Sequence, residues 1–219
     1  SLVFTAVTNA NGAGYASFTF QVQDNGGTTN SGVDLDASAN TITVDVVSVN
    51  DQPSLSATAL NPTFTSINGS ATPGAPAIFF SSSNASTADQ GQSIIDLKFT
   101  LGGLANGSDE KIYVDGTGIT LGSNSSGTTQ NNSLSYSVVI SGATATIDLI
   151  KPAGLSVASV NNIINAISYQ NTNLNSPTTG ARVLTLTQLQ DNGGVANSGV
   201  DTVSLSISSS VTVVTSSNL

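Results

Sequence analysis

The sequence predicts an all-β fold built from tandem antiparallel β-sandwich modules, with one short helix. Apolar residues alternate with polar ones in many short segments, which is the period of half-buried strands. Glycine, asparagine and serine separate nearly all of these segments, as expected of turns. A twelve-residue pattern occurs twice, which indicates that the chain contains repeated modules.

The repeated pattern spans residues 23–34 and 190–201. Each copy contains Gln-Asp-Asn-Gly-Gly and, two residues later, Asn-Ser-Gly-Val-Asp, so ten of the twelve positions are identical. Each copy lies between two alternating segments, and asparagine and glycine tolerate the positive φ angles of tight turns. We therefore predict that each copy is the loop of a β-hairpin.

One segment departs from the β pattern. Ser156 is a suitable helix N-cap, and the apolar residues that follow it have helical spacing. The pattern predicts a helix of about three turns over residues 156–167, lying across one end of the sandwich as part of the core. The apolar positions are Val157, Val160, Ile163, Ile164 and Ile167.

The two modules are unequally represented. Only 22 residues precede the first copy of the pattern, and they and the following segment predict strands at roughly 2–8, 15–23 and 40–49. So few strands cannot close a sandwich, because small isolated sheets are marginal in water. We predict that residues 1–53 are the C-terminal half of a β-sandwich repeat with its linker, and that 54–219 form a complete repeat. Strands from another chain or segment are expected to complete residues 1–53.

The composition excludes several functions. The chain has thirteen acidic and only four basic residues. Four cations are too few to neutralise a row of phosphates, so we expect no nucleic-acid binding. No apolar run reaches the ~20 residues that cross a bilayer, so we expect no membrane insertion. Charged residues make up 8% of the chain, and a surface rich in Ser, Thr, Asn and Gly favours an extracellular location.

Catalytic chemistry is poorly supported by the composition. Histidine and cysteine are absent, so no Ser-His-Asp or Cys-His arrangement is possible. A polysaccharide hydrolase could use Asp109 and Asp191, but such enzymes need a substrate cleft, usually lined with aromatic residues. Aromatic residues make up 5% of the chain and tryptophan is absent, which also argues against a sugar-binding face. We expect the protein not to be an enzyme.

The segment Ser48-Val49-Asn50-Asp51-Gln52-Pro53 resembles the Asn-Asp-Xaa-Pro junctions between cadherin-like and immunoglobulin-like tandem repeats of giant bacterial surface proteins, including repeats-in-toxin adhesins. Residues 15–53 resemble the closing half of such a repeat, beginning at Tyr15-Ala16-Ser17-Phe18-Thr19-Phe20. Residues 54–214 resemble a complete repeat. Its matching motifs are Gly107-Ser108-Asp109-Glu110-Lys111, Ile167-Ser168-Tyr169-Gln170-Asn171-Thr172 and Val211-Thr212-Val213-Val214. The chain ends Thr215-Ser216-Ser217-Asn218-Leu219, where a second such junction would be expected.

The resemblance implies a non-catalytic extender module of a large secreted or cell-surface bacterial adhesin, stiffened by calcium at the module junction. Its partners would be neighbouring modules of the same or an identical chain, with cell-surface or matrix ligands as further candidates. One alternative is a subunit of an extracellular filament or surface layer, assembled by strand complementation between chains. A ligand-binding tip domain is a further alternative, because loops at the end of a sandwich can acquire binding without leaving a motif.

Calcium takes six to eight hard oxygen ligands, and Asx-rich loops at a module junction can supply them. By analogy with cadherins, the predicted junction site comprises Asn50, Asp51, Asp89, Asp109, Glu110, Asp191 and Asn192. A weaker matching cluster comprises Asp24, Asn25, Asp34 and Asp36. The alternative is that Asp-Asn-Gly-Gly is only turn chemistry and that Asp51 satisfies backbone N–H groups. Without metal, Asp51, Asp109 and Glu110 in proximity would repel by about 1 kcal/mol or more, so either metal binds or they lie apart.

Overall fold

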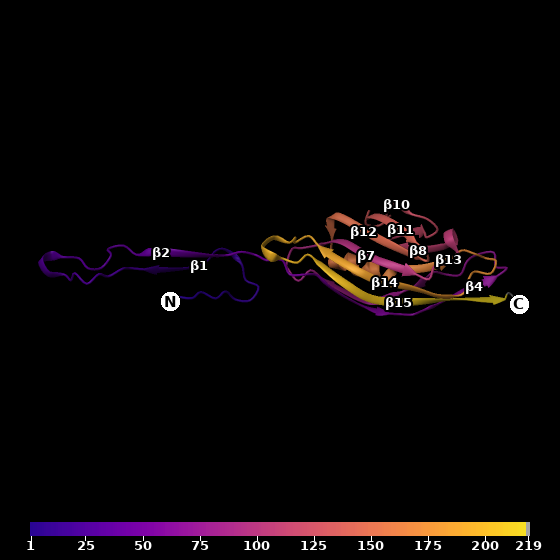
Figure 1. Cartoon of the computed structure of the whole chain (residues 1–219), viewed down its shortest axis with the longest axis horizontal. Coiled ribbons are helices and arrows are strands. Elements are labelled where there is room, and N and C mark those ends of the chain that lie inside the picture. Colours follow the sequence, from indigo (N-terminus) through magenta and orange to yellow (C-terminus); the bar gives the residue numbers. More distant parts are fainter. Residues whose placement is uncertain (218–219) are drawn as a thin grey trace. The chain divides into compact units, whose positions relative to one another are not determined.

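The computed structural model describes residues 1–217, which are mostly β: 52% of residues are in strands and 9% are helical. This confirms the predicted all-β character. The chain divides into two compact units, Ser1–Val49 (unit 1) and Asn50–Leu219 (unit 2), which Figure 1 shows coloured along the sequence. The segment Asn50–Pro53, predicted to close the first module, therefore belongs to unit 2. No helix among the described residues is both long and apolar enough to span a membrane.

Unit 1 is one antiparallel pair, β1 (Gly12–Phe20) and β2 (Asn40–Val46), with Phe18 opposite Ile42. The connecting segment contains the short 3₁₀ turn η1 (Thr29–Ser31). A strand predicted at 2–8 is absent, because no described strand pairs with these residues. Among them, Phe4 contacts Tyr15 of β1 in an edge-to-face arrangement, with ring centroids 5.9 Å apart.

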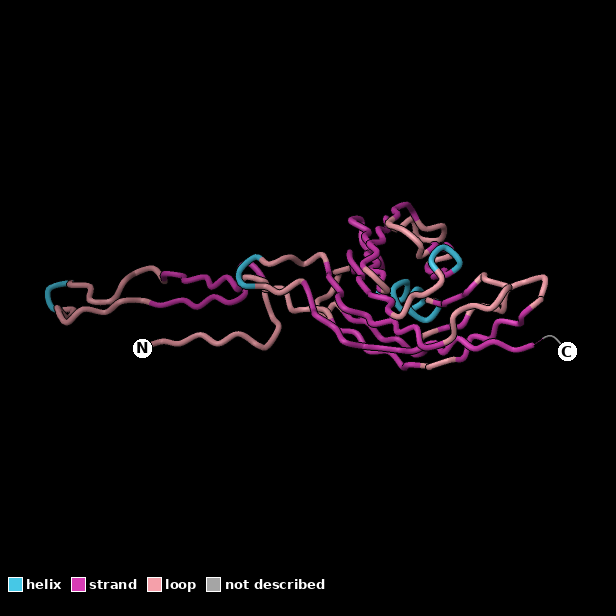
Figure 2. Tube along the Cα trace, turned by 45° about the vertical axis from the view of Figure 1, so that its right-hand side comes forward, coloured by secondary structure: helices cyan, strands magenta, loops and turns pink. Residues whose placement is uncertain are grey.

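Unit 1 has no apolar core of its own. All buried apolar side chains among the described residues belong to unit 2, whereas the apolar residues of β1 and β2 remain partly exposed. A hollow of about 320 Å³ lies between Leu2–Phe4 and the two strands. Two strands without a covered face are marginal in water, so this hairpin has the form of an incomplete sheet (Figure 2). Its exposed apolar residues include Phe18, Phe20, Val22, Leu35 and Ile42.

The larger layer of unit 2 is a seven-stranded sheet in the order β10-β11-β12-β7-β14-β15-β4. Its strands alternate as predicted, so that on β7 the side chains of Leu97, Phe99 and Leu101 are buried against the core. All neighbours are antiparallel except β15 and β4, which pair in parallel. The strands are β4 (Thr63–Asn68), β7 (Ile94–Gly102), β10 (Ser125–Thr128), β11 (Ser135–Ser141), β12 (Thr144–Leu155), β14 (Gly180–Asp191) and β15 (Thr202–Ser217).

The remaining elements of unit 2 are a four-stranded sheet β5-β13-β8-β9, a pair β3-β6 and the helix α1. The predicted helix is present as α1 (Val157–Ala166), where the Ser156 hydroxyl accepts a hydrogen bond from the Ser159 N–H at 3.1 Å. Its apolar stripe is buried at Val160, Ile163 and Ile164. The strands are β3 (Ser54–Ala59), β5 (Ala77–Ile78), β6 (Phe80–Ser86), β8 (Glu110–Val114), β9 (Thr117–Thr120) and β13 (Ser168–Asn171); the 3₁₀ turns are η2 (Gly107–Asp109) and η3 (Ala196–Ser198).

Candidate functional site at the Asn50 linker

The repeated pattern in unit 2 forms the loop between β14 and β15, as the sequence predicts. The Asp191 N–H donates to the Asp201 carbonyl at 2.9 Å, and the Gln190 side-chain amide donates to the Asp201 carboxylate at 3.0 Å. Asn197 and Ser198 have φ angles of 55° and 70°, which asparagine tolerates better than most residues. We call residues 190–201 the upper loop.

Asn50 docks onto the upper loop and is buried there. Its side-chain amide donates to the Asp191 carboxylate at 3.0 Å and to the Val200 carbonyl at 2.9 Å. Its backbone carbonyl accepts from the Val200 N–H at 2.9 Å, and its Oδ1 accepts from Gln92 at 2.7 Å. A Cβ on Gly193 would collide with the Asn50 side chain, so glycine is required at that position. The first residue of unit 2 is thereby fixed to the loop that precedes its last strand.

Asp191 is fully buried, yet its Oδ2 has no hydrogen-bond partner among the described residues. The same holds for the buried Oε1 of Gln92. The pKa of the Asp191 carboxyl is raised above its usual value, chiefly by burial. The charges of Asp201 and Asp89 also raise it, and the hydrogen bonds from Gly193 and Asn50 oppose the shift without cancelling it. This corner of unit 2 therefore holds two unsatisfied oxygens and excess negative charge.

The other predicted junction residues near Asn50 are also held by hydrogen bonds. The Asp89 carboxylate accepts from the Asp51 N–H at 2.9 Å and from Gln92 at 3.3 Å. The Asn192 side-chain oxygen accepts from the Ser93 N–H at 2.9 Å. Thus five of the seven predicted residues, Asn50, Asp51, Asp89, Asp191 and Asn192, gather around the start of unit 2.

Asp109 and Glu110 lie elsewhere, and their assignment to the junction was wrong. Glu110 forms an ion pair with Arg182 at 2.7 Å, near the first residue of β14, whereas Asp191 is the last residue of that strand. Arg182 and Asp191 are nine positions apart along β14, about 30 Å at ~3.3 Å per residue. The carboxylates are therefore apart, and the expected repulsion with Asp51 does not arise.

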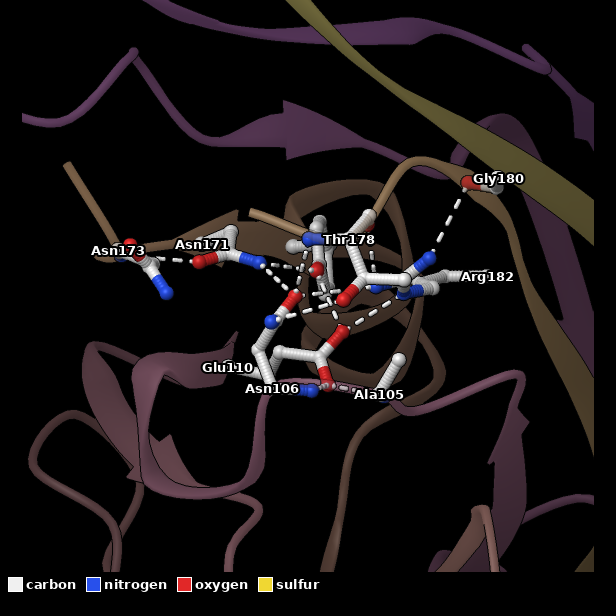
Figure 3. A network of polar contacts seen from close by, with 9 residues as sticks. Ala105, Asn106, Glu110, Asn171, Asn173, Thr178, Gly180 and Arg182 are labelled. Atoms are coloured by element: carbon white, nitrogen blue, oxygen red, sulfur yellow. Dashed lines mark hydrogen bonds and ion pairs between the residues drawn. The ribbon is translucent and has the colours of Figure 1, made fainter. Parts of the chain in front are cut away.

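Glu110 belongs to a buried polar network, shown in Figure 3. Its carboxylate also accepts from the Tyr169 hydroxyl and from the N–H groups of Ala105 and Asn106, each at 2.7 Å. Burial acts to raise the pKa of Glu110, but these hydrogen bonds and the one from Arg182 outweigh it and lower the pKa. The network joins β8, β13 and β14. Both carboxylate oxygens of Glu110 already accept two hydrogen bonds each, so neither is left for a ligand.

The weaker cluster in unit 1 is occupied by turn hydrogen bonds. The carboxylates of Asp24, Asp34 and Asp36 accept from Gly26, Gln23 and Asn40 at 2.7, 3.1 and 2.6 Å. Asn25 lies exposed in the same loop, where its side chain forms no hydrogen bond to a described residue. These interactions correspond to the turn chemistry considered as the alternative to a metal site.

The residues present at the Asn50 corner fit a hard cation only in part. No group of three or more His, Cys, Asp or Glu side chains within residues 1–217 converges in a way that could hold a metal ion. The oxygens left without a hydrogen-bond partner there are Asp191 Oδ2 and Gln92 Oε1, and the Gln92 side-chain amide also donates to the Asp89 carboxylate. Gln92 and Asp201 were missed from the sequence, although Asp201 lies within the repeated pattern.

A second unpredicted feature is a carboxyl pair on the seven-stranded sheet. Asp96 on β7 and Asp148 on β12 each have a buried Oδ1 without a hydrogen-bond partner among the described residues, and Lys98 contacts Asp148 at 3.2 Å. Burial and then the charge of Asp148 raise the pKa of Asp96 to about 6, against the opposing charge of Lys98. The sequence carried no signal for this pair beyond its alternation.

Comparison of the chain with protein-family models found no match, and comparisons with curated proteins and with solved structures found none either.

Proposed function

We propose that this chain is a non-catalytic structural module of a large secreted or cell-surface bacterial adhesin, in which sandwiches of the cadherin-like or immunoglobulin-like type follow one another in series. The observation that carries the proposal is the parallel pairing of β4 with β15 in unit 2. The absence of histidine and cysteine from the sequence supports a role without catalysis.

The chain enters and leaves unit 2 at opposite ends. Asn50 contacts Val200, just before β15 begins, and β15 then continues for 16 residues to Ser217. At ~3.3 Å per residue this strand spans about 50 Å. Asn61 contacts Ser210 and Asn68 lies opposite Ser217, so the first segment of unit 2 follows the last strand in the same direction. A module with this layout separates its neighbours by its full length.

Tension along the chain would shear the joined strands. β4 and β15 pair over six residues, from Thr63 opposite Thr212 to Asn68 opposite Ser217. Pulling the start of unit 2 one way and its end the other slides these strands past each other, so that their hydrogen bonds resist together. That geometry suits a spacer that holds surface structures out from the cell.

A tandem fusion of residues 50–217 tests this role. Each added copy should lengthen the particle by about 50 Å, the span of β15, when measured by small-angle scattering or electron microscopy. Increments near half that value would show that the ends of the module do not act as entrance and exit.

We also propose that calcium binds at the Asn50 corner, with oxygens from Asp191, Gln92 and Asp89. The two buried oxygens without partners among the described residues support this, since carboxylate and amide oxygens are ligands that calcium prefers. A bound cation would stabilise unit 2 by linkage, so its melting temperature should rise in millimolar calcium and fall in chelator. No shift, or an equal shift in Asp191→Asn, would exclude the site.

The alternative of a filament subunit is favoured by one observation, the exposed apolar residues of the unit 1 hairpin. Strand complementation from another chain would cover them. Sedimentation over a range of protein concentrations separates the two roles, because a filament subunit would associate and a spacer would remain monomeric.

A further inference from the structure

The repeated pattern adopts the same backbone conformation in both units. Asn30 and Ser31 of unit 1 have φ angles of 57° and 68°, against 55° and 70° for their counterparts Asn197 and Ser198. Each copy contains a 3₁₀ turn at the same place, η1 and η3. We call residues 23–34 the lower loop.

The internal hydrogen bonds of the two loops also correspond. The Asp24 N–H donates to the Asp34 carbonyl at 2.8 Å, as Asp191 donates to Asp201 at 2.9 Å. The carboxylate of Asp24 accepts from the Gly26 N–H at 2.7 Å, and that of Asp191 accepts from Gly193 at 2.9 Å. The lower loop therefore holds its shape without the contacts that Asn50 makes in unit 2.

The groups that bind Asn50 in the upper loop are open in the lower loop. The counterpart of Val200 is Val33, whose exposed fraction is 77% against 45% for Val200. The Val33 N–H has no hydrogen-bond partner among residues 1–217, whereas the Val200 N–H donates to Asn50. Asp24 is exposed, whereas its counterpart Asp191 is buried beneath Asn50.

Gly26 gives a second indication of a missing occupant. Its counterpart Gly193 does not have a positive φ, and glycine is required there because Asn50 and Gln92 fill the space of a side chain. Gly26 also lacks a positive φ, and the only close neighbour of a Cβ there would be the Asp24 carboxylate, at 3.0 Å. Neither backbone conformation nor packing within unit 1 requires glycine at this position, but a docked asparagine would.

We propose that the lower loop is a docking site for the asparagine of an extended Asn-Asp-Xaa-Pro segment, held as the upper loop holds Asn50. The asparagine amide would donate to the Asp24 carboxylate and the Val33 carbonyl, and its backbone carbonyl would accept from the Val33 N–H. The inference goes beyond the mechanical role and rests on the internal repeat alone, so either can fail without the other.

The test joins a copy of residues 47–55 ahead of Ser1 in the full chain through a flexible Gly/Ser spacer. About 40 spacer residues have a mean reach of roughly 35 Å, enough to follow the hairpin to the lower loop, and give an effective concentration near the millimolar range. Hydrogen exchange of the Val33 N–H is the readout. We expect it to slow by about tenfold in the fusion, because docking gives this N–H an acceptor.

Two controls make the result specific. Gly26→Ala in the fusion should restore fast exchange at Val33, while the Asp24 N–H, bonded within the loop, keeps its protection. The fusion carrying Asn50→Ala within the appended copy should also exchange fast. Unchanged Val33 exchange in the first fusion, or slow exchange that survives either control, would overturn the proposal.

The source of the natural occupant can be read from the chain without the fusion. If a second copy supplies the segment, Val33 exchange slows as protein concentration rises, and exchange at Val200 quickens as Asn50 leaves its own loop. Exchange independent of concentration excludes a second copy as the source of the segment.

Discussion

Asn50→Ala removes the side chain that fixes the start of unit 2 to the upper loop. Three side-chain hydrogen bonds are lost, to Asp191, Val200 and Gln92, while the backbone bond to Val200 is kept. A bond to a charged group contributes about 1.5–3 kcal/mol and a neutral one about 1 kcal/mol, so the loss of unfolding free energy should be about 3.5–5 kcal/mol.

Thermal unfolding followed by far-ultraviolet circular dichroism measures this loss. For a unit of this size, 1 kcal/mol corresponds to about 2–4 °C, so the melting temperature should fall by about 10 °C. Asn175→Ala is the matched control, because Asn175 is exposed and its side chain has no hydrogen-bond partner among the described residues. A fall of less than about 2 °C for Asn50→Ala would show that the contact contributes little to folding.

Further predictions concern the other buried polar groups. Asp96 has its pKa raised to about 6, so its contribution to stability is full below the unfolded value near 3.8 and is lost as the pH rises through 6. Asp96→Asn should therefore raise the melting temperature by about 3–8 °C at pH 8 but not at pH 4. An equal gain at the two pH values would show that ionisation of Asp96 is not the cause. Arg182→Ala leaves Glu110 buried without its cation and should lower the free energy of unfolding, measured with denaturant, by about 3–5 kcal/mol. The control Lys111→Ala should lower it by less than about 0.5 kcal/mol. Similar losses for the two variants would refute the importance of the ion pair.

The parts of the fold that the sequence predicted are those governed by local chemistry. The hairpin loop follows from Asp-Asn-Gly-Gly between alternating segments, and α1 follows from the Ser156 cap with its apolar stripe. Residues 2–8 show why alternation alone is insufficient, since a strand also needs a partner.

The candidate site was harder to predict because its members come from distant parts of the chain. Asn50 and Asp191 are 141 positions apart, and Glu110 and Arg182 are 72 apart. An Asp-Glu pair beside a turn looks the same in sequence whether it binds a metal ion or pairs with an arginine. Glu110 pairs with Arg182 near the start of β14, whereas Asp191 is the last residue of that strand, so Glu110 cannot belong to the site at Asp191.

The most direct test of the proposed role is the force needed to unfold unit 2 when it is pulled from its two ends. Because the chain has no cysteine, single cysteines introduced at Gln52 and Ser217 provide unique attachment points. In single-molecule stretching, this direction shears β4 against β15. It should need a clearly higher force than pulling the same unit between the exposed residues Ser123 and Ser141, each replaced by cysteine, which peels the edge strand β10 off β11 one hydrogen bond at a time. Equal forces in the two directions, or a lower force from end to end, would contradict the account.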